Sequence, residues 1–264
     1  MRGVLEDDEC IKNIIMTNKT FFGFKSVSFQ EKTNLVRDVF TSVASKYDIM
    51  NDLMSGGMHR LWKKEFIAQI PDFHGKLLDM ASGTGDIARK YYAKAKEEGI
   101  NPEITACDAS IEMLKEGRNK AVDAGILDIK YQVTEAEKLP FEDESFDYYT
   151  VAFGVRNFTD IPSALKDAYR VLKPGGKFLC LEFSHIQQPI LEPLYDFYSM
   201  NIIPFIGKIV ANDEGSYRYL VESIRKFPTQ ESFKEMITDS GFSKVNYINL
   251  NCGIVAIHVG YKLC

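Results

Sequence analysis

The spacing of apolar residues changes along this chain, and the changes predict a series of helices and strands. From Glu31 to Tyr47 the apolar positions recur every three or four residues, which is the spacing of an amphipathic helix. A second helix is expected from His59 to Ile70. After residue 75, short apolar runs alternate with helical patterns. This alternation is typical of a parallel sheet with helices on its faces.

Five short apolar runs are expected to form the parallel strands, at 76–80, 103–107, 129–133, 146–153 and 177–183. Helices are expected between them, at 86–98, 110–124 and around 161–172, and a further helix is expected to start after Thr229 and end at Gly241. Two last strands, 244–250 and 254–261, are separated by a short turn and should therefore pair antiparallel. The predicted fold is α/β, a doubly wound, mostly parallel seven-stranded sheet with a terminal antiparallel hairpin.

The chain is expected to form one domain with two elaborations. Residues 1–22 are assigned to an extension that is either disordered or wrongly included, with Met16 as an alternative start. Residues 23–264 form the domain. Within it, 23–75 is expected to be a helical flap, and 185–228, rich in aromatic residues and proline, a helical lid.

Composition excludes several classes of protein. A net charge of −5 over 264 residues provides no cationic surplus for general binding to nucleic acid. The five cysteines have no spacing typical of zinc ligands, and we expect no metal site. No apolar run approaches the ~20 residues that cross a bilayer. Without a typical targeting sequence, the bacterial cytoplasm is the favoured compartment and the mitochondrial matrix the alternative.

The first predicted strand runs into the sequence LLDMASGTGD at residues 77–86. Gly83 and Gly85 permit a tight turn and a close approach of the backbone to a ligand. The pattern also fits a dinucleotide fingerprint, which is a weak signal alone. Asp79 and Asp86, however, would repel a pyrophosphate and suit a ligand that carries positive charge, such as S-adenosylmethionine. The ordinary alternative is a strand-to-helix turn with a capping aspartate.

Longer motifs add a family resemblance. The chain resembles class I S-adenosylmethionine-dependent methyltransferases and, more narrowly, the ubiquinone/menaquinone biosynthesis C-methyltransferases. The motifs that carry this resemblance are YDIMNDLMSGGMHRLW at 47–62, FGVRN at 153–157, RVLKPGGKFLCLEFS at 170–184 and GIVAIH at 253–258. The leader TFFGFK at 20–25 is similar to the alphaproteobacterial and mitochondrial branch of that family.

The resemblance implies a set of residues that bind the cofactor. They are Asp79, Ser82, Gly83, Thr84 and Gly85 around the loop, Asp108 and Ala109 after the second strand, Glu135 and Ala136 after the third, and Ala152 at the end of the fourth. Asp108 is expected to accept hydrogen bonds from the ribose hydroxyls, with helix capping as the alternative. Many members have a serine where this chain has Ala152, so only a backbone contact is expected there.

The resemblance also implies transfer of a methyl group to a ring carbon of a polyprenylated quinol, either of the 2-methoxy-6-polyprenyl-1,4-benzoquinol type or demethylmenaquinol. Our hypothesis is that Arg156 stabilises the phenolate or an intervening water and that Asn157 orients it. Asp48 and His59 are alternative bases. A surface role for Arg156, a turn at Asp48 and a packing role for His59 are the competing interpretations.

Partners follow from the substrate. A polyprenyl tail belongs to a membrane, so a peripheral enzyme at the inner-membrane surface is expected, with the segment 202–211 as its contact. A quinone-biosynthesis complex and a homodimer are compatible with the sequence. The rival functions are a methyltransferase for another small molecule and a cofactor-binding scaffold subunit of such a complex. A dehydrogenase is disfavoured because Asp79 and Asp86 oppose a pyrophosphate.

Overall fold

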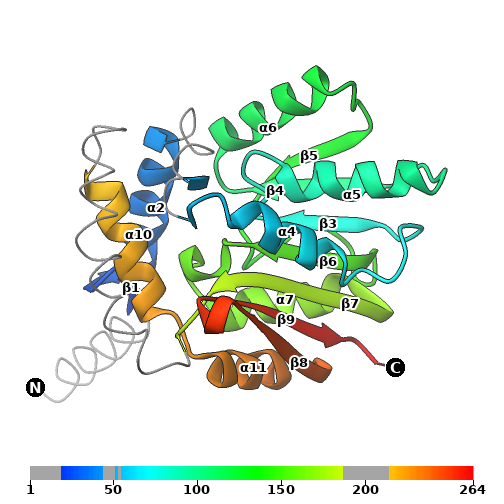
Figure 1. Ribbon diagram of the computed structural model, residues 1–264. Helices are drawn as coiled ribbons and strands as arrows, with labels where there is room; N and C mark the ends of the chain where they lie inside the picture. The colour runs from blue at the N-terminus through cyan, green and yellow to red at the C-terminus, as the bar shows by residue number, and fades with distance from the viewer. Residues whose placement is uncertain (1–18, 44–50, 53–54, 187–213, 264) are drawn as a thin grey trace, which may run out of the picture.

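The computed structural model describes residues 19–43, 51–52, 55–186 and 214–263, and its centre is a seven-stranded sheet (Figure 1). The strands follow the order β5-β4-β3-β6-β7-β9-β8 across the sheet. Their bounds are Leu77–Met80 (β3), Ile104–Asp108 (β4), Ile129–Val133 (β5), Phe146–Ala152 (β6), Leu172–Phe183 (β7), Ser243–Leu250 (β8) and Val255–Tyr261 (β9). Strands β3 to β7 pair in parallel, and β9 pairs antiparallel with both β7 and β8. The predicted fold class is confirmed.

Helices cover both faces of this sheet, and the inner strands are accordingly buried on both sides. Leu77 packs in one core and its neighbour Leu78 in the other, as the two-residue period of a strand requires. The first core joins the sheet to helices α4 (His59–Ile67), α5 (Asp86–Glu97) and α6 (Ile111–Asp123). The second joins it to α7 (Ile161–Val171) and α11 (Gln230–Asp239).

The helix starts follow the local sequence closely. Ser110 and Thr229, which the sequence analysis places at helix N-termini, each accept a hydrogen bond from the backbone N–H three residues later, at 3.3 Å. Asp160 caps α7 in the same way, bonding the N–H of Ser163. Each side chain satisfies one N–H that the first turn of a helix leaves without a partner.

One strand begins earlier than predicted. The sequence KPGG at 173–176 was expected to precede the strand at Lys177, but β7 starts at Leu172, which pairs with Phe146 of β6. The backbone of this segment is also bonded to the end of the chain, because Gly175 donates to Lys262 O at 2.7 Å and Lys262 donates to Gly176 O at 3.0 Å. Tertiary pairing therefore extends the strand through a sequence that locally favours a turn.

A second, two-stranded sheet lies beside the main one and was not predicted. Strands β1 (Lys19–Phe22) and β2 (Lys25–Ser28) form an antiparallel hairpin that leads into helix α2 (Phe29–Val43). The assignment of residues 19–22 to an extension outside the domain is therefore wrong, since Lys19 to Phe22 pair with Ser28 to Lys25.

Figure 1 shows that the hairpin and α2 lie against helix α10 (Glu214–Lys226), at the edge where the central strands end. Helix α10 falls within the predicted lid, whereas residues 187–213 of that lid, including 202–211, lie outside the described residues. None of the described helices is both long and apolar enough to cross a bilayer.

Candidate cofactor and substrate site

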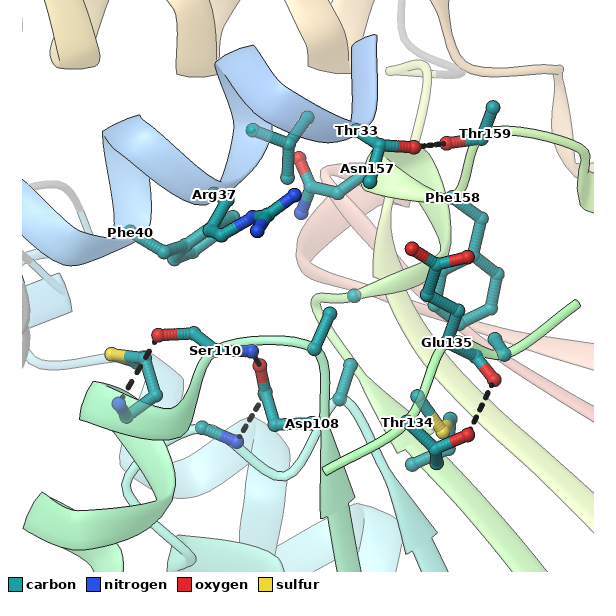
Figure 2. Close-up of a pocket in the computed structure, with 18 of the residues that line it drawn as sticks. Thr33, Arg37, Phe40, Asp108, Ser110, Thr134, Glu135, Asn157, Phe158 and Thr159 are labelled. Carbon is teal, nitrogen blue, oxygen red and sulfur yellow. Dashed lines mark hydrogen bonds between the residues drawn. The ribbon is translucent and has the colours of Figure 1, made fainter. Parts of the chain in front are cut away.

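A cavity of about 310 Å³ opens at the carboxyl ends of the central strands, in the size range of small-molecule sites. Its floor comes from the loops after β3, β4 and β5, one wall comes from the loop after β6, and α2 lies across it (Figure 2). Its lining residues are Thr33, Val36, Arg37, Phe40, Met80, Ala81, Gly83, Asp108, Ala109, Ser110, Met113, Val133, Thr134, Glu135, Ala136, Glu137, Phe153, Gly154, Asn157, Phe158 and Thr159. This is the position at which open α/β sheets bind ligands.

The glycine loop and Asp108 form one hydrogen-bonded unit on the floor. Gly83 and Gly85 have φ of +56° and +75°, which favours glycine and agrees with the role predicted for them. Asp108 Oδ2 accepts the N–H of Gly83 and Oδ1 accepts the N–H of Ser110, both at 2.9 Å. A carboxylate offers about four acceptor positions, so both oxygens retain capacity for ligand hydroxyls. Burial raises the pKa of Asp108, and these backbone donors oppose that shift.

The two acids used to reject a pyrophosphate do not line the cavity, which corrects that part of the sequence argument. Asp79 is buried beneath the loop and accepts hydrogen bonds from Ser82 Oγ at 2.7 Å and Thr150 Oγ1 at 2.8 Å. Burial raises its pKa to about 6. Asp86 pairs with the buried Lys63 at 2.9 Å. Its burial alone would raise its pKa, but Lys63, with Lys90 and Arg89, lowers it.

The charge that a ligand meets in the cavity comes instead from other residues. Asp108, Glu135 and Glu137 line the cavity, and Arg37 is the one basic residue among its described lining residues. Glu137 Oε1 accepts the backbone N–H of Thr159 at 2.7 Å, which leaves the exposed Glu135 as the more available acid. The excess of carboxylates suits a cationic ligand. The predicted preference for a positively charged ligand over a pyrophosphate therefore rests on these lining acids and not on Asp79 and Asp86.

Two residues at the ends of adjacent strands have strained backbones. Ala81 after β3 and Phe153 after β6 have φ of +51° and +59°, in the left-handed region that favours glycine. Both line the cavity. Such strain costs of order 1–3 kcal/mol per residue and is concentrated at functional sites. These two strained residues lie at the same edge of the sheet as the glycine loop, which supports a functional site there.

Arg156 lies behind the cavity wall in a buried ion pair. Its Nη1 donates to Glu182 Oε1 at 2.7 Å and to the carbonyl of Phe153 at 2.6 Å, and the side chains of both ionic partners are at most 4% exposed. Its Nε is buried and has no hydrogen-bond partner among the described residues. Arg156 does not line the cavity. The structure therefore places it one layer back, with one donor still unused.

Asn157 does line the cavity, and a residue absent from the sequence analysis holds it there. Tyr219 of α10 is 5% exposed, and its hydroxyl donates to Asn157 Oδ1 at 2.9 Å. Since the carbonyl oxygen of the amide is occupied, its NH₂ group is left to donate to other groups. Burial raises the pKa of Tyr219, so the phenol keeps its proton. An aromatic residue at an apolar position of a helix gives no sequence signal for this role.

Of the two residues predicted as alternative bases, the structure describes His59 but not Asp48. His59 is buried, and its Nδ1 lies 2.9 Å from Ser55 Oγ and 3.7 Å from Asp52 Oδ1. Burial, with the nearby Lys63, lowers its pKa. It does not line the cavity, and its contacts fit the packing interpretation. Asp48 lies outside the described residues.

The expected cofactor residues divide into a lining group and a supporting group. Gly83, Asp108, Ala109, Glu135 and Ala136 line the cavity. Asp79, Ser82, Thr84, Gly85 and Ala152 lie outside its lining and belong to the loop or to the strands beneath it.

Helix α2 supplies a part of the site that the sequence analysis missed. Thr33, Val36, Arg37 and Phe40 project from its inner face, and Figure 2 shows Arg37 extending toward Asn157. Two contacts near the start of α2 join it to the loop after β6. Thr33 Oγ1 lies 3.0 Å from Thr159 Oγ1, and the buried Lys32 donates to the carbonyl of Phe158 at 2.5 Å. An amphipathic pattern predicts an inward face but not which surface it covers.

These features fit S-adenosylmethionine. Asp108 provides acceptors for a ribose, Val133 and Ala136 provide apolar surface for a base, and the excess of carboxylates suits a sulfonium and an ammonium. The strand order and the antiparallel end of the sheet define the class I S-adenosylmethionine-dependent methyltransferases.

Solved structures of methyltransferases share this fold. A SAM-dependent methyltransferase from Thermotoga maritima matches 85% of this chain and 99% of its own, with a TM-score of 0.60 at 18% identity. Phosphoethanolamine N-methyltransferase 2 from Haemonchus contortus, solved with phosphomonomethylethanolamine and S-adenosylhomocysteine, matches 90% of this chain and 61% of its own, with a TM-score of 0.61 at 15% identity. At these identities the similarity concerns the fold.

Sequence comparisons define the family. Residues 26–262 match the ubiE/COQ5 methyltransferase family. The ubiquinone/menaquinone biosynthesis C-methyltransferase UbiE of Rickettsia bellii is 56% identical over 247 residues, which cover 93% of this chain and 100% of that protein. The protein of the same name from Rickettsia prowazekii is 55% identical over 92% of this chain and 99% of its own length. The chain therefore belongs to the ubiE/COQ5 methyltransferase family and is an S-adenosylmethionine-dependent C-methyltransferase.

Proposed function

We propose that this protein methylates a ring carbon of a polyprenylated benzoquinol, of demethylmenaquinol, or of both, in ubiquinone or menaquinone biosynthesis. The observation that carries the proposal is the similarity to the Rickettsia C-methyltransferases, which extends over their whole length. The described cavity supports it because it joins the acceptors of Asp108 on its floor to the amide of Asn157 on its wall and the guanidinium of Arg37 on α2.

The chemistry requires the protein to make a ring carbon nucleophilic. An ionised ring hydroxyl delocalises its negative charge onto the neighbouring carbons, and donors placed at the oxygen favour that ionised form. S-adenosylmethionine, when bound, supplies an electrophilic methyl group on a positively charged sulfur. The ring carbon would take the methyl group as the methyl–sulfur bond breaks, which leaves neutral S-adenosylhomocysteine, and would then lose its proton to a base or water, so that the ring regains its aromaticity.

We assign the oxygen contact to the amide nitrogen of Asn157. Tyr219 occupies the amide oxygen, so the amide can present only its NH₂ donors to a substrate oxygen or an intervening water. Arg156 is the second stabilising group in this proposal, and it acts through its positive charge from behind the cavity wall, where Glu182 holds the guanidinium. Asp48 and His59 stay alternative bases for the hydroxyl proton.

The cofactor contacts are proposed on the same basis. Asp108 would hold the ribose hydroxyls, and Glu135 and Ala136 would border the adenine. The loop of Ser82, Gly83, Thr84 and Gly85, with Ala109 and the backbone of Ala152, would support the rest, and the buried charge of Asp79 would favour the cationic end. Positioning of this kind can supply ~7–11 kcal/mol of a barrier.

Membrane contact is also part of the proposal, because a polyprenyl tail partitions into lipid. The relatives are bacterial, and we propose that the enzyme works in the bacterial cytoplasm at the inner-membrane surface. Assembly as a homodimer stays a prediction that size-exclusion chromatography of the pure protein can test. Assembly within a quinone-biosynthesis complex stays a prediction that the same measurement can test on protein co-expressed with other enzymes of quinone biosynthesis.

Product analysis tests the function directly. The purified enzyme is incubated with a methyl-labelled donor and short-tailed benzoquinol or naphthoquinol, and mass spectrometry locates the label. We expect the label on a ring carbon. Label on oxygen or nitrogen, or no transfer to either quinol by a protein that binds the donor, would contradict the proposal; the second result would favour the scaffold alternative.

Two variants test the roles assigned to Arg156 and Asn157. We expect Arg156→Ala to lower kcat by about 10²-fold or more, because it removes positive charge that favours the developing oxyanion. Tyr219→Phe should lower kcat by about tenfold, because it frees the amide of Asn157 that contacts this oxygen. The affinity for S-adenosylhomocysteine, measured by calorimetry, should stay within about twofold of the wild-type value. Near-full turnover by Arg156→Ala with normal donor binding would remove Arg156 from the site.

A further inference from the structure

The tip of the β1–β2 hairpin carries two exposed phenyl rings. Phe21 in β1 and Phe24 in the turn after it are 50% and 48% exposed, whereas the side chain of Phe22 is half-buried. Phe21 and Phe22 are consecutive residues of β1 and therefore point to opposite sides of the hairpin, and the exposed Phe24 lies in its turn. Exposed aromatic pairs of this kind mark interaction surfaces more often than isolated apolar side chains do.

The same tip carries positive charge on a protein whose net charge is −5. The ammonium of Lys226, at the end of α10, lies 4.5 Å from the ring centre of Phe21 and 5.9 Å from that of Phe24. Lys19 and Lys25 of the hairpin are exposed, as Lys226 is. The neighbouring acid, Glu222, is turned toward the backbone and accepts the N–H of Phe24 at 3.2 Å. Aromatic rings beside lysines are the composition found where proteins meet the headgroup region of a bilayer.

The inner side of this hairpin leads directly to the site. Phe22 stacks on Tyr219 with ring centres 4.0 Å apart and an interplanar angle of 11°. The hydroxyl of Tyr219 in turn holds Asn157 at the cavity wall. Figure 1 shows the hairpin beside α10, which carries Tyr219, and beside α2, which lies across the cavity. The exposed rings therefore lie on the outer surface of the structure that borders the substrate side of the cavity.

We infer that the tip formed by Phe21, Phe24, Lys25 and Lys226 inserts into the headgroup region of an anionic bilayer and holds the cavity entrance at the lipid surface. This inference rests on the proposed function, because lipid contact serves catalysis only if a membrane-borne quinol must reach Asn157. The phenyl rings enter the boundary between headgroups and acyl chains, and the lysines pair with lipid phosphates.

Vesicle binding tests the inference with the full chain. Wild-type protein is sedimented with vesicles of phosphatidylcholine, with or without phosphatidylglycerol. We expect the double variant Phe21→Ser/Phe24→Ser to partition about tenfold more weakly than wild type. Lys226→Gln should weaken binding only to the anionic vesicles. The matched control is Leu127→Ser, which removes a side chain that is 75% exposed just before β5 and should leave binding unchanged.

A second variant keeps the test decisive if the double variant folds poorly. Phe24→Trp adds an exposed indole to a chain whose single tryptophan, Trp62, is buried. We expect its fluorescence to shift to shorter wavelength when vesicles are added. No shift, no binding of wild type to either vesicle, equal binding by a folded double variant, or an equal loss in Leu127→Ser would each overturn the inference. A double variant that changes only the association state would assign the tip to contact between copies.

Activity measurements separate this inference from the proposed function. The double variant should methylate a water-soluble short-tailed quinol within about twofold of the wild-type rate, and should lose activity only on a long-tailed quinol in vesicles. If wild type methylated neither quinol, the proposed function would fail, while the vesicle measurements would still decide the role of the hairpin. Equal loss on both quinols would show that the hairpin supports catalysis instead of lipid contact.

Discussion

At the scale of single residues, the site depends on half-buried side chains that other groups of the protein already hold by hydrogen bonds. Asp108 is held by two backbone donors and Asn157 by Tyr219. Pre-arranged groups of this kind need little reorganisation when charge develops. Asp79 extends this arrangement beneath the loop, because it combines full burial with the hydroxyls of Ser82 and Thr150.

Asp79 should destabilise the protein at neutral pH. Burial raises its pKa to about 6, above the ordinary value of 3.8. Between these two values the folded state holds a proton that the unfolded state has lost, so stability falls as the pH rises through this window. We expect Asp79→Asn to raise the free energy of unfolding at pH 7.5 by up to about 3 kcal/mol, and the gain should vanish toward pH 4. Urea denaturation at several pH values measures this, with the exposed Asp123→Asn as the control.

The same variant tests whether the buried charge serves the donor. If Asp79 attracts the positive end of S-adenosylmethionine, Asp79→Asn should weaken binding of that donor by about tenfold. S-adenosylhomocysteine has no charge on sulfur, so its affinity should fall less. Equal losses for both compounds would mean that Asp79 only supports the loop, and no loss for either would remove it from the cofactor residues.

At the scale of elements, the glycine loop is positioned by the helix that packs against it. Gly117 lies in α6, and a Cβ at this position would meet the backbone of Thr84 at 3.0 Å, Gly83 O at 3.1 Å and Gly85 N at 3.2 Å. These contacts are tighter than ordinary van der Waals contact. The absence of a side chain at Gly117 therefore allows α6 to approach the loop that binds Asp108.

Gly117→Ala should accordingly affect binding more than stability. Alanine favours a helix over glycine by about 1 kcal/mol, which offsets much of the cost of displacing the loop. We expect the free energy of unfolding to change by less than about 1 kcal/mol, while affinity for S-adenosylhomocysteine falls by about fivefold or more. Asn119→Ala, at an exposed position of the same helix, is the control and should leave affinity unchanged. Unaltered affinity in Gly117→Ala would show that the loop tolerates the shift.

At the scale of the whole molecule, the N-terminal hairpin and α2 cover a site whose floor belongs to the sheet. The buried Lys32 joins the two parts through its bond to the carbonyl of Phe158. Burial lowers the pKa of Lys32 to about 8, although Glu137 opposes the shift. The contact between the two parts therefore includes a group that titrates just above neutral pH.

This contact predicts a pH dependence above neutrality. Between pH 8 and the ordinary lysine value of 10.5, the unfolded state binds the proton that folded Lys32 has lost, so this residue makes stability rise with pH. The measurement is the difference in free energy of unfolding between wild type and Lys32→Met. We expect this difference to change in favour of wild type by about 2 kcal/mol from pH 8 to pH 10. The exposed Lys130→Met is the control. A constant difference across this range would contradict the burial of the ammonium.

Most of the fold followed from local patterns because each strand and helix carries its own period. The strands near Leu78 and Ile129, and the helix caps Ser110 and Thr229, lie where the pattern placed them. The early start of β7 was not predictable in this way, because the pairing of Leu172 with Phe146 is a long-range contact.

Of the cavity, the floor and Asn157 were predictable, whereas the contributions of α2 and α10 were not. Gly83 and Asp108 lie directly after predicted strands, and parallel strands bring their carboxyl ends to one edge. Arg37 and Tyr219 come from helices far away in the sequence, and only packing decides which way their side chains point. Asp86 lies outside the cavity lining for the same reason, since it pairs with Lys63 on another helix.

The sequence alone determined the α/β class, the order of strands and helices in the main sheet, the family and the position of the glycine loop, because these depend on period and short-range motif. Tertiary structure alone decided that α2 covers the cavity, that Arg156 is paired with Glu182 behind its wall and that Tyr219 orients Asn157. Arg156 and Glu182 are 26 positions apart in the sequence, and Asn157 and Tyr219 are 62 apart. Such contacts form only when helices and strands pack against one another.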